Sequence, residues 1–166
     1  ARPYQGSIKI PMFISGNEEL LGRKYGVDES LVELRDIMPT FLDIVGADIP
    51  KHLDGKSMLK GNDRYYIHGE HLYDFKQKSH QFIVTKEDKY IWFSQTGEEQ
   101  YFDLINDPNE AHNSINDKNK QERISELRNI LIKELENSEE GYSDGKKLFV
   151  GCKTKPSLKN AILANC

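Results

Sequence analysis

Apolar and aromatic positions gather in two short runs between residues 89 and 110, and this pattern predicts a β-hairpin. Residues 90–93 are aromatic or β-branched, the types that fit a pleated, half-buried strand. A Thr-Gly pair at 96–97 supplies a turn, because glycine adopts positive φ without strain. The returning strand covers 100–104 and stops before Pro108, since proline cannot donate to a sheet ladder. We expect the rest of the chain to be arranged around this hairpin.

Two shorter apolar segments precede the hairpin and predict two more strands. They cover residues 64–71 and 81–85 and are joined by polar connections. Strands that follow one another with short connections usually pair antiparallel. The sequence therefore predicts an antiparallel sheet of about four strands.

At the opening of the chain, apolar residues recur at every second position, and this pattern predicts a strand from Gly6 to Gly16. Pro11 places this strand at a sheet edge or at a bent entry. A strand needs partners, so we expect its neighbours to lie upstream in a larger sheet. The apolar positions of this pattern are Ile8, Ile10, Met12 and Ile14.

Two segments have helical periodicity. The first begins at Asp36 as the N-cap, tolerates Pro39 in its first turn, and ends with Gly46 at the C′ position. The second begins after Asn119, which with Glu122 forms a candidate capping box. Its stripe is expected to pack on the sheet. The stripe consists of Ile124, Leu127, Leu131 and Leu135, widened by Ile130.

Composition supports a globular protein of ordinary type. The 166 residues are 37% hydrophobic and 30% charged, and no apolar run approaches the roughly 20 residues that span a bilayer. A net charge of -4 argues against nucleic acid as a partner. The first residue is Ala1 rather than Met, so we expect the sequence to be a piece of a longer protein.

The stretch His68-Gly69-Glu70-His71 carries the most suggestive side chains. On a strand, His68 and Glu70 point to one face and His71 to the other. Histidine is a proton carrier and a hydrogen-bond donor, and Glu70 can orient His68 or accept from a sugar hydroxyl. Gly69 would let a ligand approach the backbone. The alternative is a strand end whose polar side chains are satisfied within the fold.

Other polar groups give no complete active site. Cys152 and Cys166 are either a disulfide pair or two unrelated thiols, without zinc-site spacing. Lysines beside Cys152 would favour a thiolate, but a free tail cysteine is the simpler interpretation. Asp103, Asp107 and Glu110 lack the spacing of an EF-hand loop, and turn capping explains them better.

Several stretches resemble motifs of one family. The segment 3–11 is similar to Tyr-Glu-Gly-(Gly/Ser)-x-Arg-x-Pro, with Gln5 and Lys9 at the Glu and Arg positions. Residues 36–40 and 54–57 resemble its Asp-x-x-Pro-Thr helix and Asp-Gly-x-Ser loop, and 89–110 resembles its C-terminal hairpin. In this order and spacing, the chain resembles the C-terminal part of a sulfatase of the arylsulfatase type, within the alkaline-phosphatase-like superfamily. The His68 to His71 stretch resembles a motif of some bacterial members.

This resemblance implies an α+β fold in two parts. Residues 1–62 would be a strand and a helix left over from a larger α/β catalytic domain. Residues 63–166 would be a subdomain with an antiparallel sheet of about four strands, a long C-terminal helix and a tail. The family uses calcium and a formylglycine made from a Cys/Ser-x-Pro-x-Arg motif. Those elements belong to its N-terminal part, and Cys152 and Cys166 lack that motif.

The resemblance therefore implies a sulfatase fragment that is inactive alone and forms part of the substrate cleft wall. Its expected partners are the missing N-terminal domain and a sulfated small molecule or glycan, bound by His68, Glu70 and His71. A periplasmic or secreted parent is usual in the family. Two alternatives remain open: a non-enzymatic module that binds a glycan or a protein, and a piece of a related phosphodiesterase or phosphatase, whose two metal ions would mark it.

Overall fold

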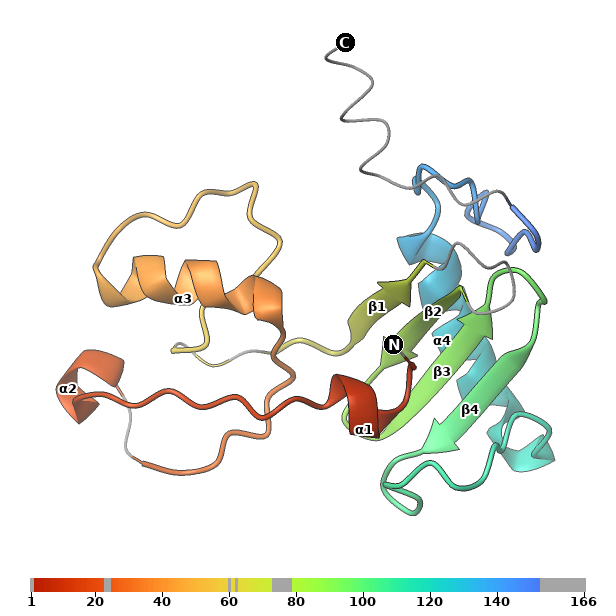
Figure 1. The fold of residues 1–166 in the computed structure, drawn as a ribbon, viewed down its shortest axis with the longest axis horizontal. Helices are drawn as coiled ribbons and strands as arrows, with labels where there is room; N and C mark the ends of the chain where they lie inside the picture. Colours follow the sequence, from red (N-terminus) through yellow and green to blue (C-terminus); the bar gives the residue numbers. More distant parts are fainter. Residues whose placement is uncertain (1, 23–24, 60, 62, 73–78, 153–166) are drawn as a thin grey trace, which may run out of the picture. The chain divides into compact units, whose positions relative to one another are not determined.

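The computed structural model describes the chain except for residues 1, 23–24, 60, 62, 73–78 and 153–166 (Figure 1). The chain forms two compact units. One unit comprises Ala1–Ile10 together with His68–Cys166, and the other comprises Pro11–Ile67. The first ten residues therefore group with the C-terminal part of the chain. The assignment of residues 1–62 to a catalytic-domain remnant stays a prediction.

The first unit is built on the expected sheet. Its strands are β1 (Ile67–His71), β2 (His80–Val84), β3 (Asp88–Phe93) and β4 (Glu99–Asp103), in the order β1-β2-β3-β4. β3 pairs antiparallel with both β2 and β4. Gly97 has a φ of 75° and donates its N–H to the Phe93 carbonyl, as a tight turn requires. The hairpin and the four-stranded sheet are confirmed.

The helix α4 (Gln121–Glu134) packs against β2 and β3, behind the sheet in Figure 1. The predicted stripe is confirmed, except that Ile130 is only half-buried and Ile132 is buried instead. The predicted cap is wrong. A 3₁₀ turn, η2 (Lys118–Lys120), precedes α4, and the Asp117 side chain caps it by accepting from the Asn119 N–H. The stripe residues that are buried are Ile124, Leu127, Leu131 and Leu135.

The predicted strand from Gly6 to Gly16 is wrong. The chain instead forms a single helical turn, α1 (Gln5–Ile8), in front of the sheet in Figure 1. Among the described residues, 9–15 form no strand. The Tyr4 ring lies edge-on against Phe102 of β4, with 6.0 Å between ring centroids. Long-range side-chain contacts of this kind, which the local pattern does not contain, hold the opening segment.

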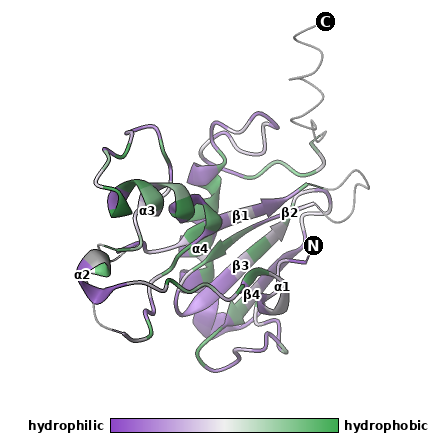
Figure 2. Cartoon of the chain, turned by 60° about the vertical axis from the view of Figure 1, so that its left-hand side comes forward, coloured by the Kyte–Doolittle hydropathy of each residue, from purple (hydrophilic) through white to green (hydrophobic). Residues whose placement is uncertain are grey.

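The second unit contains the short helices α2 (Glu18–Leu21), η1 (Leu34–Asp36) and α3 (Ile37–Ile44). Gly46 follows the α3 C-cap with a φ of 68°, as predicted. The Asp36 side chain, however, does not cap α3. α3 is coloured largely as hydrophobic in Figure 2, yet its Met38 and Phe41 side chains are exposed.

No helix among the described residues has the length and apolar character needed to cross a membrane.

Candidate functional site

His68 and Glu70 lie on the helix-covered face of the sheet and are joined by Gln81 of β2. The His68 Nε2 lies 2.8 Å from the Gln81 Oε1, and the Gln81 Nε2 donates to the Glu70 Oε2 at 3.2 Å. Gln81 is fully buried, and the His68 Nδ1 lies 4.0 Å from the Glu134 Oε2 of α4. Since the Gln81 oxygen can only accept, the His68 Nε2 must carry the proton. The structure thus brings His68 and Glu70 together through a residue that the sequence analysis did not consider.

His71 lies on the opposite face, as the strand period predicts. Its ring centroid is 5.4 Å from that of the buried His80, which in turn contacts Phe93. Burial lowers the pKa of His71 below its usual value. A neutral imidazole at neutral pH can donate one hydrogen bond and accept another. The three predicted site residues therefore divide into a pair on one face and a single histidine on the other.

Gly69 is required by packing. A Cβ at this position would lie 2.1 Å from the Phe82 Cζ, far inside van der Waals contact. The Phe82 ring therefore occupies the space over Gly69, in which the sequence analysis expected a ligand. The consequence is that the β1 backbone is fixed closely against β2.

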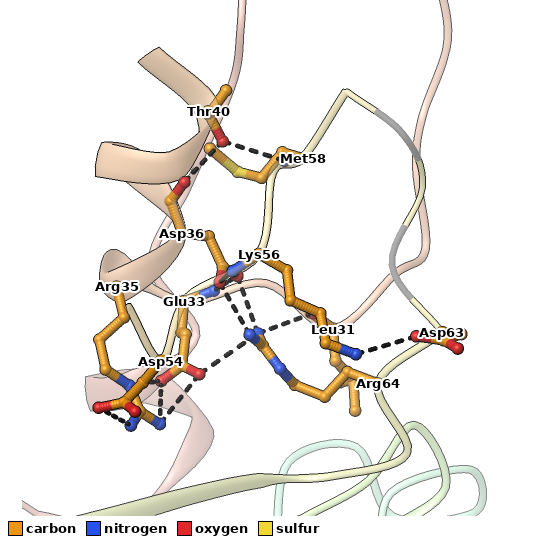
Figure 3. A network of polar contacts seen from close by, with 10 residues as sticks. All are labelled: Leu31, Glu33, Arg35, Asp36, Thr40, Asp54, Lys56, Met58, Asp63 and Arg64. Carbon is orange, nitrogen blue, oxygen red and sulfur yellow. Dashed lines mark hydrogen bonds and ion pairs between the residues drawn. The ribbon is translucent and has the colours of Figure 1, made fainter. Parts of the chain in front are cut away.

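A second polar cluster belongs to the unit Pro11–Ile67 and centres on the fully buried Asp36 (Figure 3). Arg64 donates to both carboxylate oxygens at 2.8 Å, and the backbone N–H groups of Lys56 and Glu33 donate at 2.8 and 2.9 Å. Burial raises the pKa of Asp36, but these hydrogen bonds outweigh it and hold the pKa below its usual value. The carboxylate stays charged and ties three segments together.

The other residues of the two family motifs at 36–40 and 54–57 extend the same cluster. The Thr40 hydroxyl donates to the Asp36 carbonyl at 2.6 Å and accepts from the Met58 N–H at 3.0 Å (Figure 3). The Ser57 hydroxyl donates to a carboxylate oxygen of Asp43. The resemblance to Asp-x-x-Pro-Thr and Asp-Gly-x-Ser is thus explained by local folding: these residues satisfy one another.

A third cluster joins the hairpin to the opening segment. Lys89, fully buried on β3, donates to a carboxylate oxygen of Glu110 at 2.5 Å and to the Pro3 carbonyl at 2.9 Å. Burial lowers the pKa of Lys89, and Glu110 opposes that shift. Lys89 and Glu110 lie at the two ends of one family motif, but their pairing was not predicted from the sequence. The opposite charges of these two residues were the feature of the sequence that could have indicated an ion pair.

The remaining candidates are accounted for by local contacts. Asp107 accepts from the Ala111 and His112 N–H groups, and Asp103 accepts from the Ile105 and Asn106 N–H groups, which confirms turn capping for these two. The same prediction is wrong for Glu110, whose carboxylate pairs with Lys89 instead. The half-buried Cys152 lies near backbone carbonyls, while Cys166 lies outside the described residues, so their pairing stays open. The part of the chain that the structure describes contains no group of three or more His, Cys, Asp or Glu side chains that could hold a metal ion.

Comparisons with known proteins agree on one family. A model described as N-sulphoglucosamine sulphohydrolase, C-terminal, matches residues 2–138. An arylsulfatase of Clostridium perfringens is 51% identical over 156 residues, which cover 90% of this chain and 32% of the relative. The chain thus spans about a third of that relative's length.

Solved structures share the fold. One was determined in complex with its substrate, D-glucosamine-2-N,6-O-disulfate; its TM-score is 0.57 at 22% identity, covering 68% of this chain and 25% of that one. Another, a 2-O GAG sulfatase, has a TM-score of 0.57 at 19% identity, covering 75% of this chain and 31% of that one. At these identities the likeness establishes the arrangement of sheet and helix and nothing about the ligand.

Proposed function

Because the chain belongs to the family of N-sulphoglucosamine sulphohydrolase C-terminal domains, we propose that it is the C-terminal part of a sulfuric ester hydrolase. The observation that carries this proposal is the 51% identity to an arylsulfatase over 90% of the chain. The comparisons do not favour a stand-alone binding module. The substrate class we propose is a sulfated carbohydrate or an aryl sulfate.

The residues of this chain do not fit the calcium and formylglycine that the resemblance implies. Among the described residues no cluster of three metal-ligating side chains exists, and Cys152 is followed by Lys-Thr-Lys rather than by the required Pro and Arg. We therefore propose that both groups are held by parts of the protein outside this chain, and that the chain alone has no sulfatase activity. A periplasmic or secreted location for the whole protein is proposed from the resemblance.

We propose that β1 contributes to the substrate cleft, with different roles for its polar residues. His71 contacts the substrate directly, since it lies on the sheet face that α4 does not cover. His68 and Glu70 act by fixing β1, since both are bonded to the buried Gln81. A neutral His71 suits hydrogen bonds to a sugar hydroxyl or a sulfate oxygen.

Steady-state kinetics on the complete protein and on residues 1–166 would test the proposal. With an aryl sulfate and D-glucosamine-2-N,6-O-disulfate as substrates, we expect turnover only by the complete protein. Turnover by the isolated chain, or none by the complete protein, would contradict the proposal.

The roles within β1 need a second comparison in the complete protein. We expect His71→Ala to raise KM for the sulfated sugar about tenfold, the size of one lost hydrogen bond to a charged group. His68→Ala should instead lower thermal stability, with a smaller change in KM. His112→Ala is the matched control, because His112 is an exposed histidine of the same unit. Equal KM values for His71→Ala and His112→Ala would remove His71 from the substrate site.

A further inference from the structure

Glu110 makes contacts that neither strand pairing nor turn formation requires. One carboxylate oxygen accepts from the Lys89 Nζ, and the other accepts from the backbone N–H of Gln5. Lys89 also donates to the Pro3 carbonyl, so both members of the ion pair bind the opening segment. The two side chains are only 0% and 2% exposed. This buried pair thus binds the backbone on both sides of Tyr4, at Pro3 and at Gln5.

The opening segment has little else to hold it. α1 is one turn of four residues with no buried side chain, and a helix of that length is unstable by itself. Tyr4 adds a hydrogen bond from its hydroxyl to the Gln100 Oε1 at 3.0 Å and the ring contact with Phe102. The position of residues 3–8 on the sheet therefore depends on side chains contributed by β3, β4 and the segment after β4.

The arrangement carries two costs that stability alone does not explain. Glu110 has a φ of 55°, a left-handed conformation that L-residues other than Asn and Asp rarely adopt. A buried ion pair also loses its hydration, and an apolar pair of similar size is often as stable. What the ion pair adds is geometry, because a carboxylate with a fixed lysine on one side offers a single place for the Gln5 N–H.

The pair also lies on a particular face of the sheet. Lys89 is opposite Val84 and Phe102 in the strand register. The Phe102 ring in turn contacts the Tyr4 ring. His80 and Phe82 share this face by the alternation of β2, and His71 joins them through its ring contact with His80. The opening segment and His71 therefore occupy the same side of one sheet, opposite α4.

We propose that Lys89 and Glu110 form a positioning latch. The latch fixes residues 3–8 on the sheet, and in the complete enzyme it sets the polypeptide that leads into Pro3 relative to His71. The first part concerns the fold of this chain alone. The second part rests on the proposed sulfatase function. Lys89 and Glu110 are positioning residues and do not touch the substrate.

Hydrogen exchange on residues 1–166 tests the first part. In Glu110→Gln, the amides of Gln5, Ser7 and Ile8 should exchange at least tenfold faster, while amides of β3 and β4 keep their protection. Glu122→Gln, which removes an exposed acid of α4, is the matched control and should leave the segment unchanged. Unchanged exchange at residues 5–8 in Glu110→Gln would overturn the latch. An equal increase throughout β3 and β4 would also overturn it, because the pair would then serve the core in general.

A double variant separates geometry from stability. Lys89→Met with Glu110→Leu replaces the pair by apolar groups and should leave thermal unfolding of the sheet close to that of the parent chain. The Gln5 N–H would still lack its acceptor, so residues 5–8 should remain exchange-prone. Restored protection at residues 5–8 would show that apolar packing suffices, and the latch would be rejected.

Kinetics on the complete enzyme test the second part. Glu110→Gln and the double variant should both lower kcat/KM for a sulfated sugar at least tenfold, even where the double variant melts like wild type. Wild-type kcat/KM in the double variant would overturn the positioning role. If the complete protein hydrolyses no sulfate ester, the proposed function fails, whereas the exchange result on residues 1–166 still decides whether the latch exists.

Discussion

The two compact units bury different kinds of side chain. In the unit of Ala1–Ile10 and His68–Cys166, the sheet and α4 enclose aromatic and aliphatic residues. The core of this unit is formed by buried aliphatic and aromatic side chains from Phe82 to Tyr142. The unit Pro11–Ile67 instead buries Asp36, Pro39, Thr40 and Ser57. Many of its large apolar side chains are exposed: Phe13, Ile14, Tyr25, Val27, Leu34, Met38, Phe41, Val45 and Tyr65.

The two kinds of buried side chain have different effects: apolar burial stabilises a fold, whereas buried polar clusters fix its geometry. Burial of apolar surface is the dominant favourable term in folding, and the first unit has it. Hydrogen-bonded ion pairs add little net stability, because their desolvation offsets their attraction, but they fix geometry. The Asp36 cluster thus fixes the segments around Glu33, Lys56 and Arg64 relative to one another through polar contacts. Such extensive apolar exposure is typical of a surface that is covered in the complete protein.

The largest effect should follow from a change in the apolar core. Leu127→Ala, on the buried face of α4, is expected to lower the free energy of unfolding by about 4 kcal/mol, since it leaves a cavity. Urea unfolding followed by the fluorescence of Trp92, the single tryptophan, measures this. Asn129→Ala on the exposed face of the same helix is the control. A loss below that of the control would mean that α4 does not cover the core.

A smaller and local effect is expected at the polar cluster. Asp36→Asn removes the nearer of the two carboxylates that pair with Arg64, the other being Glu33 at 3.3 Å, and should destabilise this cluster by about 3 kcal/mol. Hydrogen exchange at the Lys56 and Glu33 amides reports on it. Asp63→Asn is the control, because that carboxylate is almost fully exposed and its bond to Lys56 contributes little.

The same variant has a pH signature. The folded pKa of Asp36 is lowered below its unfolded value of 3.8, so the carboxylate stabilises the fold at pH values above 3.8. That stabilisation is lost as the pH falls through the folded pKa. The difference between the parent chain and Asp36→Asn should therefore be constant near neutrality and shrink in acid below pH 3.8. A difference that grew on acidification would contradict the assigned charge state.

The smallest effect in the isolated chain should come from the exposed face of α3. Phe41 is 62% exposed, so Phe41→Ser should change stability by less than about 0.5 kcal/mol. In the complete protein, where we expect that face to be covered, the same change should cost about 2 kcal/mol or more. Thermal unfolding of both forms makes the comparison. Equal effects would show that α3 presents the same exposed face in both.

The parts of the fold that could be predicted are those governed by short-range patterns. The 89–104 hairpin needs only two runs of strand-forming residues and one glycine turn, and the α4 stripe needs only helical spacing. The failures depend on residues far away in sequence. Nothing near Ile8 indicates a helical turn in place of a strand, because the residues that hold this segment are distant in sequence. They are Lys89, Phe102 and Glu110, which contact Pro3, Tyr4 and Gln5.

The candidate site shows the same limit. Strand period alone predicted that His68 and Glu70 share a face and that His71 does not. It could not show that Gln81 joins the pair, because that contact depends on how β1 and β2 are placed. It also could not show that the Phe82 ring covers Gly69. Asp36 is a good N-cap residue by type, but its carboxylate does not cap α3. It accepts hydrogen bonds from Arg64 and from the Lys56 N–H, which are distant in sequence.

The latch also affects the order in which the chain can fold during synthesis. Gln5 leaves the ribosome 105 residues before Glu110, the acceptor of its backbone N–H. At ordinary translation rates that interval is roughly 5 to 20 seconds, which is very long compared with hairpin formation. For most of this interval the opening segment has neither Lys89 nor Glu110 to bind, and residues 11–67 are completed meanwhile. The opening segment is thus among the last parts of this chain to reach its place, and a chaperone that acts on this protein would find residues 3–8 available until then.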